Sequence, residues 1–391
     1  MILLNTNYDD LFQQVRDIEK FILSCDNSID CTISYYSYQS ILEMLGELTG
    51  RSFPYSKDVI KQCEKYQVSS CDDQLIEMRD SNFIENKDHH LAFLCSAYFE
   101  CSSIINKVFN HPDVDWLMAK SIPDLDIVHN QDRDLVLNFF QNENKLLLQY
   151  YLEMEAMGNF YLCPKSDFFD IRGGLTVFNP VCNCCNLFFK SSYPNFTSLQ
   201  AVPHEMGHVI DFYDYRERFS LQSQGLMTLQ GIYGEVISSY YEQKFLEYYL
   251  EHGNRLDDVT LSLLLYFDQR LQYLWDVLVV TMMEEQDIRY IMNHSVYLND
   301  CHEILVENGH LTCMPELDDE GRILFLDDAL EYGYGFVLAN YFLDYPDSYQ
   351  KFLNIRSGDF DARKLESIGV TSSEVSKSLV KRTEKIFGRY L

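Results

Sequence analysis

The sequence predicts a mainly α-helical protein of many helices with one small β-sheet. Glycine (17) and proline (9) are scarce among its 391 residues, so few positions favour turns or break helices. Apolar residues recur at three- and four-residue steps along most of the chain, which is the period of an amphipathic helix. Residues 158–195 differ, because glycine, proline, four cysteines and short aromatic runs indicate strands and turns there.

The first helices are marked by apolar residues that share a face. Two such series are Leu11, Val15, Ile18 and Ile22, and then Ile41, Leu45 and Leu48. Gly50 follows the second series at the position where helices commonly end in a left-handed residue. A further helix is expected over residues 134–154. The helical pattern returns after Ser198 and continues to the C-terminus.

The charge balance limits the expected partners. Sixty Asp and Glu residues against 31 Lys and Arg give a net charge of −29. Nucleic acids and anionic membranes are bound largely through basic residues, so neither is an expected partner. An acidic surface can instead attract basic substrates.

The N-terminal sequence and the cysteine content predict a cytoplasmic protein with reduced thiols. The first six residues lack a basic segment and turn polar after four residues, unlike a signal peptide. The longest apolar stretch, 273–283, contains Asp276 and is shorter than the ~20 residues of a membrane-spanning helix. Twelve cysteines are too few for a disulfide scaffold of this length.

Residues 204–208, His-Glu-Met-Gly-His, have the form H-E-x-x-H. On a helix, His204 and His208 lie one turn apart on the same face, so both imidazoles can reach one metal ion. Glu205 then lies beside the ion without binding it, where it can take a proton from water. Pro203 precedes the motif, so the helix either begins there or bends. The pattern predicts one zinc ion per chain, and the alternative is a surface helix with two solvated histidines.

A catalytic zinc ion needs a third protein ligand. Residues 234–250 read as a helix on which Glu235, Ser238 or Ser239, and Glu242 share a face. Glu235 follows the second histidine by 235 − 208 = 27 residues, enough for a loop and a returning helix. Spacing alone leaves Glu235, Glu217 and Glu242 as open alternatives.

Residues 235–242 resemble the Glu-(Ile/Val)-x-Ser-x-(aromatic)-x-Glu signature of the thimet oligopeptidase/oligoendopeptidase F family of zinc peptidases. That family also has His-Glu-x-Gly-His about this far upstream, and its glycine matches Gly207. The family's edge-strand, helix-entry and tyrosine-rich C-terminal motifs resemble residues 172–176, 197–200 and 331–336. The likeness covers about residues 172–370.

The resemblance implies a fold, a domain organisation and an activity. The fold would be a two-lobed, multi-helix zincin in which the small sheet lies next to the zinc helix. Residues 1–155 would form an N-terminal helical lobe, and residues 156–391 the zinc peptidase region. The activity would be zinc-dependent endopeptidase cleavage of short peptides.

The resemblance also assigns roles at the metal. The zinc ligands would be His204, His208 and Glu235, and the general base would be Glu205. Glu242 would orient one of the zinc ligands without itself binding the ion. That role extends to Ser238 on the same helix face.

The remaining roles concern the substrate. Tyr334, together with Tyr332, would donate a hydrogen bond to the oxyanion of the reacting carbonyl. Gly173 and Gly174 would bind the peptide backbone by adding a strand.

The chain departs from the family pattern at several positions. Asp211 stands where the family commonly has a histidine, and Arg322 and Asp327 stand where some members have histidine and tyrosine. Only about 200 residues precede the zinc motif, fewer than is typical. Two alternatives therefore stay open: a zinc exopeptidase or other metallohydrolase on the same scaffold, and a weakly active peptide-binding relative.

Three other patterns are expected to be structural. Cys182, Cys184 and Cys185 are expected to be small, partly buried residues, with a redox-sensitive thiol as the alternative. The pair His89 and His90 is expected in a solvated loop. An aromatic stripe at helical spacing is expected to pack in the core, namely Tyr240, Tyr241, Phe245, Tyr248 and Tyr249.

Overall fold

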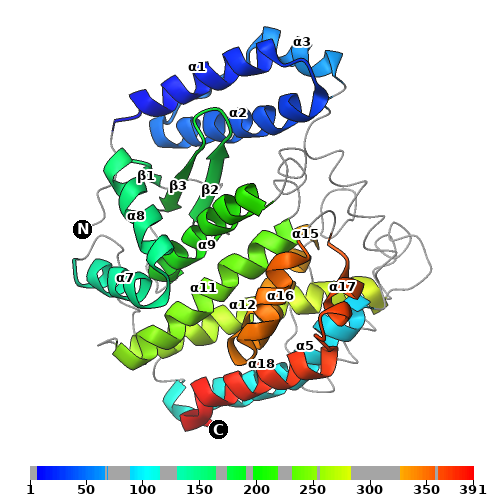
Figure 1. The fold of residues 1–391 in the computed structure, drawn as a ribbon. Coiled ribbons are helices and arrows are strands. Elements are labelled where there is room, and N and C mark those ends of the chain that lie inside the picture. Colours follow the sequence, from blue (N-terminus) through cyan, green and yellow to red (C-terminus); the bar gives the residue numbers. More distant parts are fainter. Residues whose placement is uncertain are drawn as a thin grey trace. The chain divides into compact units, whose positions relative to one another are not determined.

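A computed structural model describes ten parts of the chain: residues 7–66, 68, 89–114, 130–163, 174–190, 197–218, 231–252, 256–282, 326–356 and 360–391. Helices dominate these residues, and one three-stranded sheet lies among them (Figure 1). The prediction of a mainly helical protein with a small sheet is confirmed. Among the described residues, no helix combines the length and the apolar character of a membrane span.

The contacts divide the chain into two compact units, each assembled from separate segments. The first unit comprises Met1–Met78, Pro123–Gln230 and Phe245–Gly253, and the second Arg79–Ile122, Gly231–Lys244 and Asn254–Leu391. This grouping differs from a division at residue 155, because residues on both sides of that position contribute to both units.

The N-terminal part of the first unit consists of three helices: α1 (Asp9–Ser24), α2 (Ser28–Thr49) and α3 (Lys57–Lys65). Helix α1 packs against the other two. The two predicted apolar series are buried between them, which confirms these helices. Helix α2 ends as predicted, with Gly50 in the left-handed conformation at φ 65°.

The single helix predicted over residues 134–154 is wrong in one respect, because two helices occupy that region. They are α7 (Asn130–Glu143) and α8 (Lys145–Met157). Asn144 separates them with an extended backbone, and its side chain accepts a hydrogen bond from the Leu146 N–H. Asparagine is a preferred N-cap residue, so the break follows from local chemistry that the apolar period conceals.

The sheet has the strand order β1-β3-β2 and consists of β1 (Phe160–Cys163), β2 (Gly174–Asn179) and β3 (Cys184–Lys190). Strand β3 pairs parallel to β1 and antiparallel to β2, so β2 is an edge of the described sheet. Because side chains alternate between faces, Val177 joins the core formed with α1–α3, while Phe178 stacks on Phe212 of helix α9.

Helix α9 (Thr197–Arg218) packs against β2 and β3 and carries the H-E-x-x-H motif. The sheet therefore separates the N-terminal helices from the motif helix within the first unit (Figure 1). Helix α8 also packs against α9.

The described secondary-structure elements of the second unit are all helices. Helix α12 packs against α15, α5 packs against α18, and α15 also packs against α18. The elements are η1 (Leu91–Cys95), α5 (Ser96–Phe109), α12 (Leu256–Met282), α15 (Leu326–Asp344), α16 (Pro346–Asn354), α17 (Ala362–Ser367), α18 (Ser372–Phe387), η3 (Gly388–Tyr390) and the first part of α11 (Gly231–His252).

Helix α11 carries the predicted aromatic stripe. Four of its five members are buried, and Tyr248 is partly exposed. Tyr240 stacks on Tyr349 of α16, and Phe245 packs edge-on against Phe139 of α7. The stripe is therefore core packing, as expected.

Candidate metal centre

Helix α9 presents both histidines of the motif from one face. The helix runs through Pro203, which removes one backbone donor directly before the first histidine. The rings of His204 and His208 lie with centroids 5.0 Å apart. His204 is buried and His208 partly exposed, so the pair lies at the margin of the packed interior.

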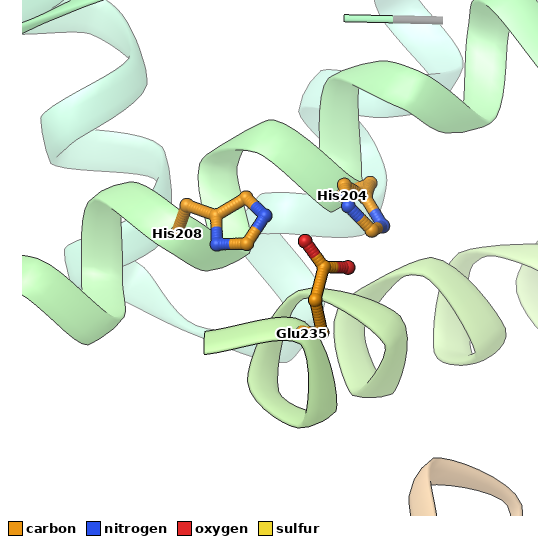
Figure 2. A group of neighbouring side chains, drawn as sticks. All are labelled: His204, His208 and Glu235. Atoms are coloured by element: carbon orange, nitrogen blue, oxygen red, sulfur yellow. The ribbon is translucent and has the colours of Figure 1, made fainter. Parts of the chain in front are cut away.

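Glu235 of α11 completes a group of three metal-binding side chains. His204, His208 and Glu235 each offer one ligand atom, and these atoms lie within 4.8 Å of one another. Figure 2 shows the Glu235 carboxylate directed toward the two imidazole rings. Within the described ranges, no other three His, Cys, Asp or Glu side chains form such a group.

The three side chains fit a metal ion by their chemistry. Two imidazoles and one carboxylate form a known donor set of catalytic zinc sites, which keep a further coordination position open. Zinc–ligand distances of about 2.0–2.2 Å place the donors of one ion roughly 3.4 Å apart. The three ligand atoms, which lie within 4.8 Å of one another, are thus near enough to serve one ion.

The structure separates the alternatives for the third ligand. Glu235 joins the group, and Glu242 does not. The side chain of Glu217 lies outside the described residues. Glu242 accepts a hydrogen bond of 2.8 Å from the Tyr266 hydroxyl and lies 3.6 Å from the Arg270 guanidinium. Its predicted role in orienting a ligand stays a prediction.

Glu205 is held by the edge strand β2. The Thr176 hydroxyl donates a 2.6 Å hydrogen bond to Oε2 of Glu205. A Cβ atom at Gly174 would lie 2.8 Å from both Cγ and Oε1 of the same side chain. A side chain at position 174 would therefore displace Glu205 from its present position, in which the Thr176 hydroxyl holds its carboxylate.

Thr176 was not among the predicted site residues. It follows Gly174 by two positions in a strand, so both face the same side of the sheet. The two-residue alternation of side chains along a strand is the sequence signal that could have identified Thr176. Gly174 is also predicted to bind substrate, and its contact with Glu205 does not test that role, which stays a prediction. Gly173, the other residue predicted to bind substrate, lies outside the described residues.

Helix α15 approaches α11 closely beside Glu235. A Cβ atom at Gly335 would lie 2.7 Å from the Ser239 hydroxyl and 2.9 Å from the Glu235 carbonyl oxygen. One turn earlier on each helix, the Glu331 carboxylate occupies the space beside Gly231. The two glycines therefore permit the short distance between these helices.

Ser238 lies one turn after Glu235, as predicted. Its hydroxyl donates to the Glu235 carbonyl oxygen at 3.1 Å and lies 3.4 Å from Oε2 of the carboxylate. It is thus placed to restrain the orientation of the Glu235 side chain.

The two predicted oxyanion tyrosines lie in different environments. Tyr334 is fully buried, and its hydroxyl lies 2.7 Å from Nδ1 of His90. Tyr332 is partly exposed, and the buried Arg270 guanidinium lies 4.5 Å from its ring centroid. Both catalytic roles stay predictions.

The expectation that His89 and His90 are both solvated is wrong for His90. Adjacent residues point apart, so His89 is partly exposed while His90 is buried against Tyr334. Burial is the main factor that lowers the pKa of His90 from 6.5 to about 4, with a smaller contribution from His89. The ring is therefore neutral at pH 7.

Comparisons of this chain with models of protein families, with curated proteins and with solved structures found no match.

Proposed function

We propose that this chain is a zinc-dependent endopeptidase that hydrolyses short peptides, with a two-lobed zincin fold. The observation that carries the proposal is the convergence of His204, His208 and Glu235, with Glu205 next to the first ligand in the sequence. Two imidazoles, one carboxylate ligand and an adjacent carboxylate base are the requirements of a zinc peptidase. The resemblance of residues 235–242 to a zinc peptidase signature adds support.

The chemistry is divided between the metal and the chain. When bound, a zinc ion supplies a Lewis acid that polarises a substrate carbonyl and makes a water molecule more acidic. Glu205 accepts the proton of that water on Oε1, while Thr176 holds Oε2. The same carboxyl group then donates the proton to the leaving amine nitrogen. Burial of Glu205 excludes competing solvent and strengthens these interactions.

The chain also offers groups for the peptide itself. Strand β2 has one edge unpaired in the described sheet, so an extended peptide can add to it beside Glu205. Of the two tyrosines, Tyr332 retains exposed surface and is the better candidate to donate to the substrate oxyanion. The Arg270 guanidinium, 4.5 Å from the Tyr332 ring centroid, stabilises the position of this ring by a cation–π interaction.

The test is the substitution Glu205→Gln, which keeps the size of the side chain and removes its basicity. The variant is expected to bind as much zinc as the wild type and to cleave peptides about 10²–10⁴-fold more slowly. Glu153→Gln, an exposed carboxylate on α8, is the matched control and should retain full activity.

Product masses from peptides of graded length identify the type of peptidase. Internal cleavage supports the endopeptidase, whereas release of single terminal residues supports the exopeptidase alternative. Tight peptide binding by the zinc-loaded chain without turnover supports the peptide-binding alternative. Equal cleavage by Glu205→Gln and the wild type would contradict the assigned base.

A further inference from the structure

The turn between β2 and β3 brings two thiols together. The Sγ atoms of Cys182 and Cys184 lie 3.1 Å apart, closer than an ordinary van der Waals contact of about 3.5–4.0 Å. Cys182 is exposed, Cys184 partly exposed and Cys185 buried, which confirms partial burial for this group. Cys182 and Cys184 are free cysteines.

The backbone of the turn fixes this approach. The Asn179 side-chain oxygen accepts hydrogen bonds from the N–H groups of Val181 and Cys182, at 2.9 and 3.3 Å. Asn183, between the two cysteines, is left-handed at φ 55°. In such a bent turn the Cα atoms of residues i and i+2 lie about 5–7 Å apart, which overlaps the range of about 4.4–6.8 Å that a disulfide spans.

The two thiols differ in acidity. A hydrogen bond from Cys184 is the main factor that lowers the pKa of the Cys182 thiol, and the same interaction raises the pKa of Cys184. The thiolate is the nucleophile in thiol–disulfide exchange. Cys182, which is the more exposed of the pair, is therefore the attacking residue, and Cys184 the resolving one.

A second pair of cysteines provides a contrast in the same unit. The Sγ atoms of Cys31 and Cys63 lie 3.9 Å apart, but both side chains are buried between α2 and α3. Burial is the main factor that raises the pKa of Cys63 to about 12. Proximity alone therefore does not make a reactive pair, and exposure and acidity distinguish the Cys182–Cys184 turn.

We propose that Cys182 and Cys184 form a thiol–disulfide exchange site that reacts with small disulfides of the glutathione disulfide class. The Cys182 thiolate attacks one sulfur of the reagent, whose S–S bond breaks and releases one thiolate, which takes up a proton. Cys184 then gives up its proton and attacks the Cys182 sulfur, releasing the second thiolate, which is protonated in turn. The reagent is reduced to two thiols, and the chain is oxidised by the loss of two hydrogen atoms.

The test treats the folded chain with glutathione disulfide and measures the mass of the tryptic peptide covering residues 173–190. The wild type is expected to lose about 2 Da from this peptide, as intramolecular disulfide formation requires. Cys185→Ser should behave like the wild type. Cys184→Ser should instead retain one glutathione on Cys182, because the resolving thiol is absent.

The buried pair is the internal control. Cys31 and Cys63 should remain reduced in the folded chain and react with an alkylating reagent only after denaturation. The proposal is overturned if the peptide keeps its mass under conditions that oxidise exposed thiols, or if Cys182→Ser still forms the disulfide. Oxidation of Cys31 and Cys63 at the same rate as Cys182 and Cys184 would overturn it as well.

Discussion

At the scale of single residues, one carboxylate and the hydroxyl that holds it dominate the candidate site. Glu205 has Gly174 on one side and receives the Thr176 hydrogen bond on Oε2. A hydrogen bond to a charged group contributes about 1.5–3 kcal/mol. Holding one oxygen fixes the direction of the other, so Thr176 acts as a positioning residue for the proposed base.

Thr176→Val removes that hydroxyl and keeps the shape of the side chain. We expect unchanged zinc content and a fall in kcat/KM of about tenfold or more, because the lost bond is worth about 1.5–3 kcal/mol. Thr176→Ser retains the hydroxyl and is the matched control, which should stay close to the wild type. Activity of the Val variant equal to that of the Ser variant would show that the bond is not needed.

His90 predicts a pH dependence of stability. Its folded pKa of about 4 lies below its ordinary 6.5, so the unfolded chain takes up the proton first as the pH falls. The free energy of unfolding is therefore not reduced by His90 above pH 6.5. It falls as the pH is lowered toward 4, by up to about 3 kcal/mol. His89 lowers this pKa further, and Asp361 opposes the shift.

The measurement compares unfolding of the wild type and His90→Asn in denaturant from pH 7 to pH 4. Asparagine keeps a polar atom near the position of Nδ1 and does not titrate. The wild type should lose stability relative to the variant as the pH falls. A difference between the two proteins that is constant over this range contradicts the buried, neutral histidine.

At this scale, the sequence predicts ligands better than the residues that support them. The spacing of His204 and His208 follows from helix geometry alone, so the local sequence is enough to predict that they share a face. The local sequence does not predict the partners of Tyr334 and Glu205, because His90 precedes Tyr334 by 244 residues and Thr176 precedes Glu205 by 29. Such contacts depend on tertiary folding, which no local pattern encodes.

At the scale of secondary-structure elements, the packing of α15 on α11 fixes the helix that carries Glu235. At Gly335 a Cβ atom would meet the Ser239 hydroxyl and also the backbone of Glu235. The backbone cannot move aside as a flexible side chain can, so this contact restrains the position of Glu235.

Gly335→Ala is expected to destabilise the protein by about 1–3 kcal/mol, although alanine favours helices, because its Cβ overpacks the contact with Glu235. Zinc affinity should fall by about tenfold or more as the ligand moves. Gly388→Ala, with nothing within 4 Å of the added atom, is the control. Zinc titration and denaturant unfolding check both variants, and equal behaviour of the two would contradict this packing argument.

Most helices were predictable because a buried face repeats with the helix period, as in α1 and α2. The break at Asn144 was missed because both flanking helices continue the apolar pattern. The strand region was placed by its turn residues and aromatic runs. Its order β1-β3-β2 was not predictable, since parallel pairing of β1 with β3 depends on contacts between distant segments.

At the scale of the whole molecule, the net charge of −29 is the dominant electrostatic property. Under the proposed function, it predicts faster association with basic peptides than with acidic ones of the same length. The advantage in kcat/KM should shrink as salt is raised, because the Debye length falls from about 10 Å at 0.1 M to about 3 Å at 1 M. A salt-independent preference, or a preference for acidic peptides, would contradict this prediction.

The division of the chain into units lay beyond sequence reasoning. Each unit is assembled from separated segments, and helix α11 contributes residues to both. The composition indicates no linker between the units, because glycine and proline are scarce and form no segment typical of a domain boundary. A linear division at one position therefore could not describe the grouping that the contacts show.

Metal analysis of the purified chain tests directly whether His204, His208 and Glu235 hold one zinc ion. We expect one zinc ion per chain, removed by a chelator and restored by added zinc. We also expect loss of that ion when all three side chains are replaced by alanine. A wild-type chain that binds no zinc, or a triple variant that binds as much as the wild type, would show that these three side chains do not form a zinc site.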